Sequence, residues 1–525
     1  MDNLRRFFEK QKILVMLSLV LILILSGCSA DDAIASTPDE VIETLADTQE
    51  EMDETTKTEI DKTAYSELFD DEKVHEINIE IAAADWAELL ANPQDETYYS
   101  ASITVDGNFV SDVGFRTKGN SSLKSVASSE SERYSFRVKI DKYIDDQNLM
   151  GLDEFVLNNM FSDPSYLREY LSYKIMGEEG LNVPLNNFVQ VKINDELYGL
   201  YLMVEAIDDS YLTRLFGDND GNLYKQESGS TLVYEENSEY KNSEQKNGKD
   251  ESKEDLSNFI KILNDMPIGE KGDIESVLDV ESALKYIAAN TVLENYDSYN
   301  GKFAQNYYLY NNEGKFVVLP WDYNMSFGGF PEGAQSDAAI DEPISGTSME
   351  NVPMISKLLS VAEYKERYYE IIKEYIVLLG DFENQVTALA DKIRPYVEAD
   401  PTKFVTMEQF EYSVAYQEVS VTQKAPIANE NPIDAQTNVT PYNGPERGAL
   451  PSDEEAFSSG ERPVFGETPE ARERPEPGVR PDNGQFNGGM IGNRQGGVAL
   501  SGTEASLINI VQSRLENLRN QLNER

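Results

Sequence analysis

Three oxygen-bearing side chains gather around a predicted hairpin and have the chemistry of a divalent-cation site. The patterns at 306–310 and 315–319 predict two strands joined by a turn. Asp322 stands just after the second strand, Asn306 begins the first, and Asp297 lies in the segment that leads into it. Two carboxylates and one amide oxygen suit Mg²⁺, a hard cation that often completes its shell with water and phosphate oxygens.

The register of the hairpin decides whether these side chains meet. A turn that pairs Tyr310 with Lys315 places Asn306 opposite Leu319, at the end of the hairpin where Asp322 follows. Asp322 considered alone could equally cap the turn that comes after it. The convergence of all three side chains favours metal binding.

The surrounding pattern predicts an α+β protein, with a β-rich N-terminal half and a helix-rich C-terminal half. Alternating apolar and polar residues predict strands and hairpins at 74–81, 99–119, 134–141 and 188–208. Helical spacing predicts helices at 82–92, 162–180, 279–299, within 350–395 and at 504–522. Ser162, with Pro164 close behind it, is the expected N-cap of the second of these helices.

The N-terminal residues 1–28 have the pattern of a lipoprotein signal peptide. A basic segment precedes the apolar stretch 13–25, which is followed by Ser26-Gly27-Cys28, similar to a bacterial lipobox. Cys28, the only cysteine in the chain, is the expected lipidation site, so no intrachain disulfide can form. The alternative is a plain signal anchor. The mature protein is expected outside the cytoplasm, anchored by acyl chains to the bacterial cell membrane.

Composition divides the rest of the chain. Residues 29–73 are expected to be a disordered acidic linker, 74–420 the folded domain, and 421–500 a disordered Pro/Gly-rich segment. The helix within 501–525 is expected to dock on the domain, and the polar stretch 227–256 to be a mobile insertion. The formal charge of −50 argues against a nucleic-acid partner.

An ordered set of motifs resembles the CotH (spore coat protein H) family over roughly residues 74–410. The motifs are FRTKGNSS (115–122), YSFRVKID (134–141), NLYKQ (222–226), ENYDSYN (294–300), NYYLY (306–310) and LPWDYNMSFG (319–328). The resemblance implies an atypical protein-kinase-like fold with two lobes, and the use of ATP with Mg²⁺ or Mn²⁺.

The resemblance also implies roles for individual residues. In protein kinases a catalytic Asp precedes a hairpin whose exit carries a metal-binding Asp, so Asp297 would orient the attacking hydroxyl and Asp322 would bind the metal. Asn306 would make a further metal contact. The chain departs from the pattern because no His-Arg precedes Asp297, and because Asn324 stands where relatives often carry a second Asp.

Candidate nucleotide contacts come from the β-rich half. The turn in RTKGNSS offers backbone N–H groups to phosphate. By analogy with kinases, Lys139 would be the phosphate-binding lysine of a central strand with Glu169 as its ion-pair partner, although the face bearing Lys139 could instead be solvated. The full set of expected nucleotide contacts is Arg116, Lys118, Lys139, Glu169, Glu205 and Lys225.

The predicted function is that of a protein kinase that transfers phosphate to Ser or Thr of an extracytoplasmic protein. The alternative is a catalytically inactive cell-surface structural or interaction module with the same fold. A carbohydrate-active protein with paired carboxylates is less favoured, because no aromatic sugar-binding platform is evident.

Overall fold

The computed structural model describes residues 64–248, 251–330, 337–418 and 505–525. The described residues up to Gln417, together with 505–525, belong to one compact unit. The predicted signal peptide with Cys28, most of the predicted acidic linker and the 421–500 segment lie outside the described residues. No described helix combines the length and apolar character needed to span a bilayer.

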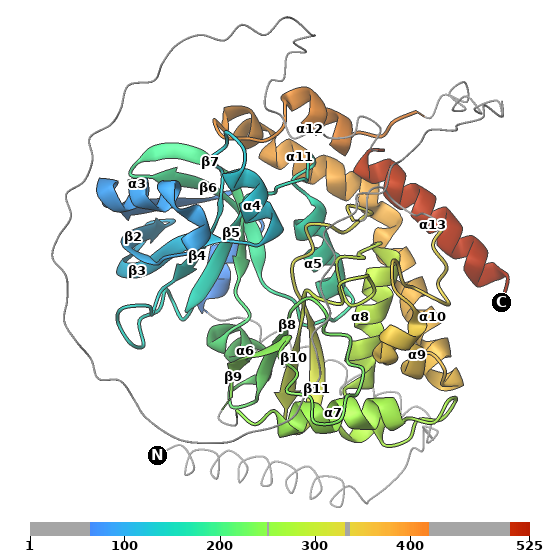
Figure 1. The fold of residues 1–525 in the computed structure, drawn as a ribbon. Coiled ribbons are helices and arrows are strands. Elements are labelled where there is room, and N and C mark those ends of the chain that lie inside the picture. The colour runs from blue at the N-terminus through green and yellow to red at the C-terminus, as the bar shows by residue number, and fades with distance from the viewer. Residues whose placement is uncertain (1–63, 249–250, 331–336, 419–504) are drawn as a thin grey trace, which may run out of the picture. The chain divides into compact units, whose positions relative to one another are not determined.

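Seven strands close into a barrel in the N-terminal half, drawn in blue to green in Figure 1. They are β1 (His75–Ile81), β2 (Tyr99–Val105), β3 (Asn108–Lys118), β4 (Ser135–Lys139), β5 (Glu154–Asn158), β6 (Asn186–Ile193) and β7 (Glu196–Glu205). Their order is β1-β2-β3-β4-β5-β7-β6, and a parallel pairing of β1 with β6 closes the ring. Closure leaves no strand edge unpaired.

The barrel interior is filled by alternate residues of each strand. On β4, Phe136 and Val138 are fully buried in the barrel core, while Arg137 and Lys139 point out of it, as predicted. All five residues of β5 are buried, because its outer face is covered as well. The apolar core residues of β5 alternate: Phe155 and Leu157 belong to the barrel core, and Val156 to the core of the helical half.

A second, four-stranded sheet carries the hairpin predicted around 306–319. Its order is β11-β10-β8-β9. The strands are β8 (Leu223–Gln226), β9 (Ser243–Asn247), β10 (Tyr307–Asn312) and β11 (Lys315–Pro320). The strand β9 lies in the stretch expected to be mobile, and its pairing with β8 gives residues 243–247 a defined structure.

The hairpin register differs from the predicted one. Lys315 pairs with Asn312 and not with Tyr310. The turn contains only Glu313 and Gly314, whose φ values of 50° and 92° are typical of a two-residue type I′ turn. The prediction was wrong because it left four residues unpaired at the turn. With the observed register, Tyr307 pairs with Pro320, so the residues just outside this pair, Asn306 and Trp321, flank the hairpin end next to Asp322.

Helices pack on both the barrel and this sheet. They are α3 (Ala83–Ala91), α4 (Ser121–Ala127), α5 (Arg168–Glu178), α6 (Asp209–Phe216), α7 (Glu254–Asp265), α8 (Val280–Val292), α9 (Pro353–Leu358), α10 (Ala362–Leu378), α11 (Phe382–Ala399), α12 (Met407–Val414) and α13 (Leu507–Asn523). In Figure 1, α5 lies between the barrel and α8. The protein is therefore α+β, with a β-barrel region followed by a mainly helical region.

The folded unit and the helix α5 begin at other residues than predicted. The first described residues, Ala64–Phe69, form a 3₁₀ helix that buries Tyr65 and Leu68, so the last ten residues of the predicted linker, 64–73, belong to the folded unit. The α5 helix begins at Arg168 and not at Ser162, whose φ of 64° is left-handed. The predicted C-terminal helix is confirmed, and its apolar residues are buried in the core of the helical half.

Candidate functional site

Lys118 and Glu169 are linked through the side-chain amide of Asn158. Lys118 Nζ donates a hydrogen bond of 2.7 Å to Asn158 Oδ1, and Asn158 Nδ2 donates one of 2.8 Å to Glu169 Oε2. Asn158 and Glu169 are buried, and Lys118 is half-buried. An amide offers one acceptor and one donor side, so it connects an ammonium to a carboxylate in a fixed orientation.

The strand registers explain why Lys118 and Asn158 meet. Lys118 pairs with Ser135, and the next residue, Phe136, pairs with Leu157. Phe136 and Leu157 point into the barrel, so their neighbours along the strands point outward. Lys118, Ser135 and Asn158 therefore form one row across β3, β4 and β5, on the side that α5 covers.

The charge of Asp322 affects the pKa values of both Lys118 and Glu169. Burial lowers the pKa of Lys118, while the carboxylates of Asp322 and Glu169 oppose that change. Burial also raises the pKa of Glu169 to about 7, and the charge of Asp322 adds to the rise. Lys118 and the hydrogen bonds from Asn158 and Tyr173 lower it. Asp322 is thus close enough to influence both ends of the Lys118–Glu169 link.

Asp322 is held at the end of β11 by α5. Its φ of 61° is left-handed, a conformation that Asp tolerates better than most residues, and its N–H donates a hydrogen bond of 3.0 Å to the Tyr173 hydroxyl. Arg168 of α5 donates to the carbonyls of Ser326 and Phe327, at 2.6 and 2.8 Å. The helix that carries Glu169 therefore also fixes the segment that follows Asp322.

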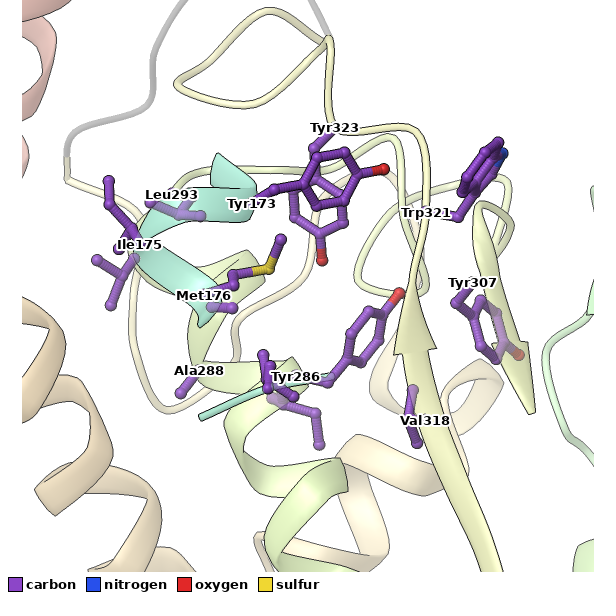
Figure 2. Packing of buried hydrophobic residues seen from close by; sticks show 14 of the residues in the cluster. Tyr173, Ile175, Met176, Tyr286, Ala288, Leu293, Tyr307, Val318, Trp321 and Tyr323 are labelled. Atoms are coloured by element: carbon purple, nitrogen blue, oxygen red, sulfur yellow. The ribbon is translucent and has the colours of Figure 1, made fainter. Parts of the chain in front are cut away.

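Aromatic packing stabilises the contact between α5 and the segment that follows β11. Figure 2 shows Tyr173 of α5 beside Tyr323, with Tyr286 of α8 below them. The ring centroids of Tyr173 and Tyr323 are 5.8 Å apart. The Tyr323 hydroxyl donates to Asn290 Oδ1 at 2.7 Å, which ties the residue after Asp322 to α8. These tyrosines thus pack α5, α8 and the segment after β11 against one another.

Asp297 lies in the loop between α8 and β10, and two side-chain amides orient it. Gln305 Nε2 donates to Asp297 Oδ1 at 2.7 Å, and Asn306 Nδ2 donates to Asp297 Oδ2 at 3.1 Å. Burial raises the pKa of Asp297 to about 6, and the charge of Asp322 adds to the rise, while the two amides lower it. A carboxylate with a pKa this near neutrality is suited to accept a proton.

The oxygen atoms around Asp322 fit a divalent cation. Within the described part of the chain, the Asp322 carboxylate accepts no hydrogen bond and forms no ion pair, and Asn306 uses only its Nδ2 towards Asp297. The described residues contain no cluster of three His, Cys, Asp or Glu side chains that could bind a metal alone. Mg²⁺ does not need one, because it commonly takes one or two carboxylates and completes its shell with substrate phosphates and water.

The predicted pairing of Lys139 with Glu169 is wrong. Lys139 Nζ lies 3.0 Å from Asp141 Oδ1 and 3.6 Å from Glu154 Oε2. Along β4 it stands four residues from Ser135, the partner of Lys118, which is roughly 13 Å at the usual rise of a strand. Lys139 is therefore at the far end of the strand, and Lys118 takes the place next to Glu169.

The other predicted nucleotide contacts divide into two kinds. Arg116 forms an ion pair with Glu96, and buried Glu205 forms one with Arg214 at 2.6 Å, so both have structural partners. Lys225 is 2.5 Å from Glu227 Oε1, yet its charge also lowers the pKa of Lys118, which brings it into electrostatic range of the site.

Two important residues were missed in the sequence. Asn158 ends a five-residue buried strand, and the run EFVLNN has the same form as FVVLPWD: apolar residues followed by a polar side chain at the strand end. This signal could have identified Asn158. Tyr173 carries no such signal, because its position one helical turn after Glu169 matters only once β11 packs nearby.

Comparisons with known proteins show the family to which this chain is similar. The family model described as CotH kinase protein matches residues 115–425, a range that includes Lys118, Glu169, Asp297 and Asp322. Inner spore coat protein H of Bacillus subtilis is 28% identical over 274 residues, which cover 50% of this chain and 73% of that protein.

A second relative is more distant. Invasin CotH2 of the fungus Rhizopus delemar is 23% identical over 273 residues, 47% of this chain and 45% of that protein, so the match spans less than half of the invasin. The family model covers more than half of the present sequence. The protein therefore belongs to the CotH kinase family.

Proposed function

We propose that this protein is an ATP- and divalent-metal-dependent protein kinase with a two-lobed, kinase-like fold, acting on Ser or Thr of an extracytoplasmic protein. The observation that carries the proposal is the convergence of Lys118, Glu169, Asp297 and Asp322, which come from β3, α5, the loop before β10 and the end of β11. Family membership supports nucleotide and metal use in general.

Each side chain then has a defined task. Lys118, oriented by Asn158 and Glu169, neutralises phosphate oxygens of ATP. Asp322 and the amide oxygen of Asn306 would hold Mg²⁺ or Mn²⁺, which supplies positive charge to the β- and γ-phosphates. Asp297 orients the acceptor hydroxyl and takes its proton.

The transfer step is a displacement at phosphorus. A bond forms between the acceptor hydroxyl oxygen and the γ-phosphorus, and the bond from that phosphorus to the β–γ bridging oxygen breaks, leaving ADP. The hydroxyl proton passes to Asp297, whose raised pKa of about 6 keeps it unprotonated at neutral pH yet basic enough to accept. Lipidation at Cys28 would confine the reaction to the membrane surface, and no nucleic acid takes part.

An inactive cell-surface module is the competing function. It is favoured by Asn324, which stands where the family resemblance implies a second acidic residue.

Transfer of label from γ-labelled ATP distinguishes the two functions. We expect wild-type protein with Mg²⁺ or Mn²⁺ to label a Ser/Thr-containing surface protein or its own 421–500 segment, and Asp297→Asn to lose transfer but still bind nucleotide. Asp322→Asn should lose metal-dependent ATP binding. If the wild type neither binds ATP with either metal nor transfers label, the module is the correct function.

A further inference from the structure

A buried arginine of the C-terminal helix α13 contacts the end of α8 and the loop that carries Asp297. Arg514 is 2% exposed, although it lies more than 90 residues beyond Glu418, where the preceding described segment ends. Its Nη2 donates a hydrogen bond of 2.8 Å to the carbonyl of Thr291, and its Nε lies 3.8 Å from Glu294 Oε1. Glu294 stands three residues before Asp297.

The hydrogen bond from Arg514 to Thr291 caps the C-terminal end of α8. Thr291 is in the last turn of that helix, whose terminal carbonyls lack partners within the helix. A guanidinium at this end satisfies one carbonyl and interacts favourably with the helix dipole. Arg514 also donates from Nη1 to the carbonyl of Ala338 at 2.8 Å, so it joins two segments to α13.

The contact with Arg514 stabilises the buried carboxylate of Glu294. It is 1% exposed and has a left-handed φ of 48°, so both its charge and its backbone are costly to maintain. Its carbonyl accepts a hydrogen bond from Gly328, and the carbonyl of Leu293 accepts one from Phe327. The stretch before Asp297 is therefore bonded to the stretch after Asp322, and Arg514 lies beside this junction.

Two further observations place α13 against the same junction. Leu293, Glu294 and Phe327 line a small cavity together with residues of α13, namely Ile510, Val511 and Arg514. The charge of Arg514 lowers the pKa of Tyr296, the neighbour of Asp297, while burial raises that pKa to about 12. The influence of α13 thus extends to the residue adjacent to the proposed base.

We propose that Arg514 is a positioning residue that holds Asp297 in place through Thr291 and Glu294, so that α13 is an integral part of the catalytic apparatus. The effect of Arg514 on catalysis rests on the proposed kinase function, whereas its effect on the order of the loop does not. The contacts of Arg514 with Thr291 and Glu294 lie in the segment that leads to Asp297, so we expect its effect to fall on turnover more than on ATP binding.

Two hydrogen bonds between Asn509 and Gln417 hold the start of α13 beside the segment that follows α12. Asn509 Oδ1 accepts from the N–H of Gln417 at 2.8 Å, and Asn509 Nδ2 donates to the carbonyl of Gln417 at 2.9 Å. This pair of hydrogen bonds joins the two ends of residues 418–508 directly to each other. The position of Arg514 is therefore fixed by contacts inside the unit, independently of the length of that segment.

The test compares Arg514→Met with Arg519→Met in the full chain. Arg519 is exposed on the same helix, so it controls for a general loss of charge. We expect amide exchange in peptides covering 291–300 and 322–330 to become about tenfold faster in Arg514→Met, with a barrel peptide covering 186–205 unchanged. The turnover number should fall roughly tenfold or more while the KM for ATP stays within about threefold.

Two further variants keep the test decisive. Arg514→Lys retains the charge but loses the forked hydrogen bonds, so an intermediate effect is expected if Arg514→Met does not fold. Glu294→Gln combined with Arg514→Met removes the buried charge that faces Arg514 in the wild type and should restore much of the exchange protection. Exchange in 291–300 that is unchanged in Arg514→Met, or faster to the same degree throughout the domain, would overturn the inference. A wild type without transferase activity would refute the kinase function and leave the exchange result to decide the loop-ordering half.

Discussion

The Tyr173 hydroxyl accepts a hydrogen bond of 3.0 Å from the backbone N–H of Asp322. Tyr173 lies one helical turn after Glu169, so a single helix, α5, holds both the carboxylate linked to Lys118 and the backbone of the proposed metal ligand. The relative position of the lysine and the metal-binding carboxylate therefore depends on how α5 packs between the barrel and β11.

Substitution of Tyr173 by Phe should loosen Asp322 without disturbing the fold. Phe lacks the hydroxyl that contacts both the Asp322 N–H and Glu169, and loss of these hydrogen bonds at a buried site costs about 1–3 kcal/mol of unfolding free energy. We expect chemical denaturation to show that loss and titration with Mg²⁺ to show weaker metal-dependent ATP binding. Tyr170→Phe is the matched control, since Tyr170 is on the same helix and stacks on Phe188. Equal losses in metal-dependent binding for both variants would show that the Asp322 contact is unimportant.

Lys118 and Lys139 should differ in their effect on ATP affinity. Lys118→Met removes the ammonium linked to Glu169 and should weaken Mg²⁺-ATP binding by roughly ten- to a hundredfold, as expected for a lost charge-assisted phosphate contact. Lys139→Met removes a partly exposed ion pair with Asp141, and the affinity should remain within about threefold. Calorimetric titration measures both, and a larger loss for Lys139→Met would contradict the assignment.

The raised pKa of Asp297 predicts a pH-dependent cost to stability. Its pKa rises from 3.8 to about 6 because the carboxyl is buried near Asp322. The protonated form is thus favoured by folding, and this stabilisation is present below about pH 4 and is lost as the pH rises through about 6. Asp297→Asn does not titrate, so its stability relative to wild type should increase between these pH values.

The size of this effect can be bounded. A pKa change from 3.8 to about 6 corresponds to roughly 3 kcal/mol, which partial exposure to solvent reduces to about 1–2 kcal/mol. Urea denaturation at pH 4, 5, 6 and 7.5 measures the difference. The exposed Asp145→Asn should show no such trend. A constant difference between wild type and Asp297→Asn at all four pH values would mean that Asp297 titrates normally.

Gly199 should tolerate no side chain. A Cβ at this position would lie 2.5 Å from Arg133 Nη1 and 2.7 Å from Asp400 Oδ1, within the buried ion pair that joins the segment before β4 to the end of α11. Gly199→Ala should therefore cost about 1–3 kcal/mol of unfolding free energy through overpacking. Gly380→Ala meets no atom within 4 Å and should change stability by less than about 1 kcal/mol in either direction. Thermal unfolding of both variants measures the contrast, and similar midpoints would argue against close packing at Gly199.

The sequence by itself determined the elements and the residue types of the site. Alternation identified the strands of YSFRVKID with Phe136 and Val138 inside, because a strand side chain can only point to one of two faces. The run KFVVLPWD identified Asp322 as a polar residue at a buried strand end, and helical spacing identified the C-terminal helix. These features depend on neighbouring residues in the chain, so they are visible without the fold.

Only the tertiary structure decided which residues meet. Lys118 and Lys139 both lie on outward faces of barrel strands, and the sequence cannot distinguish them; the pairing of β3 with β4 and the packing of α5 place Lys118 beside Glu169. Likewise Arg514 is an ordinary helical arginine until α13 packs against the end of α8. Contacts between distant segments depend on strand register and helix packing, and these are set by the burial of the whole core, not by any local pattern.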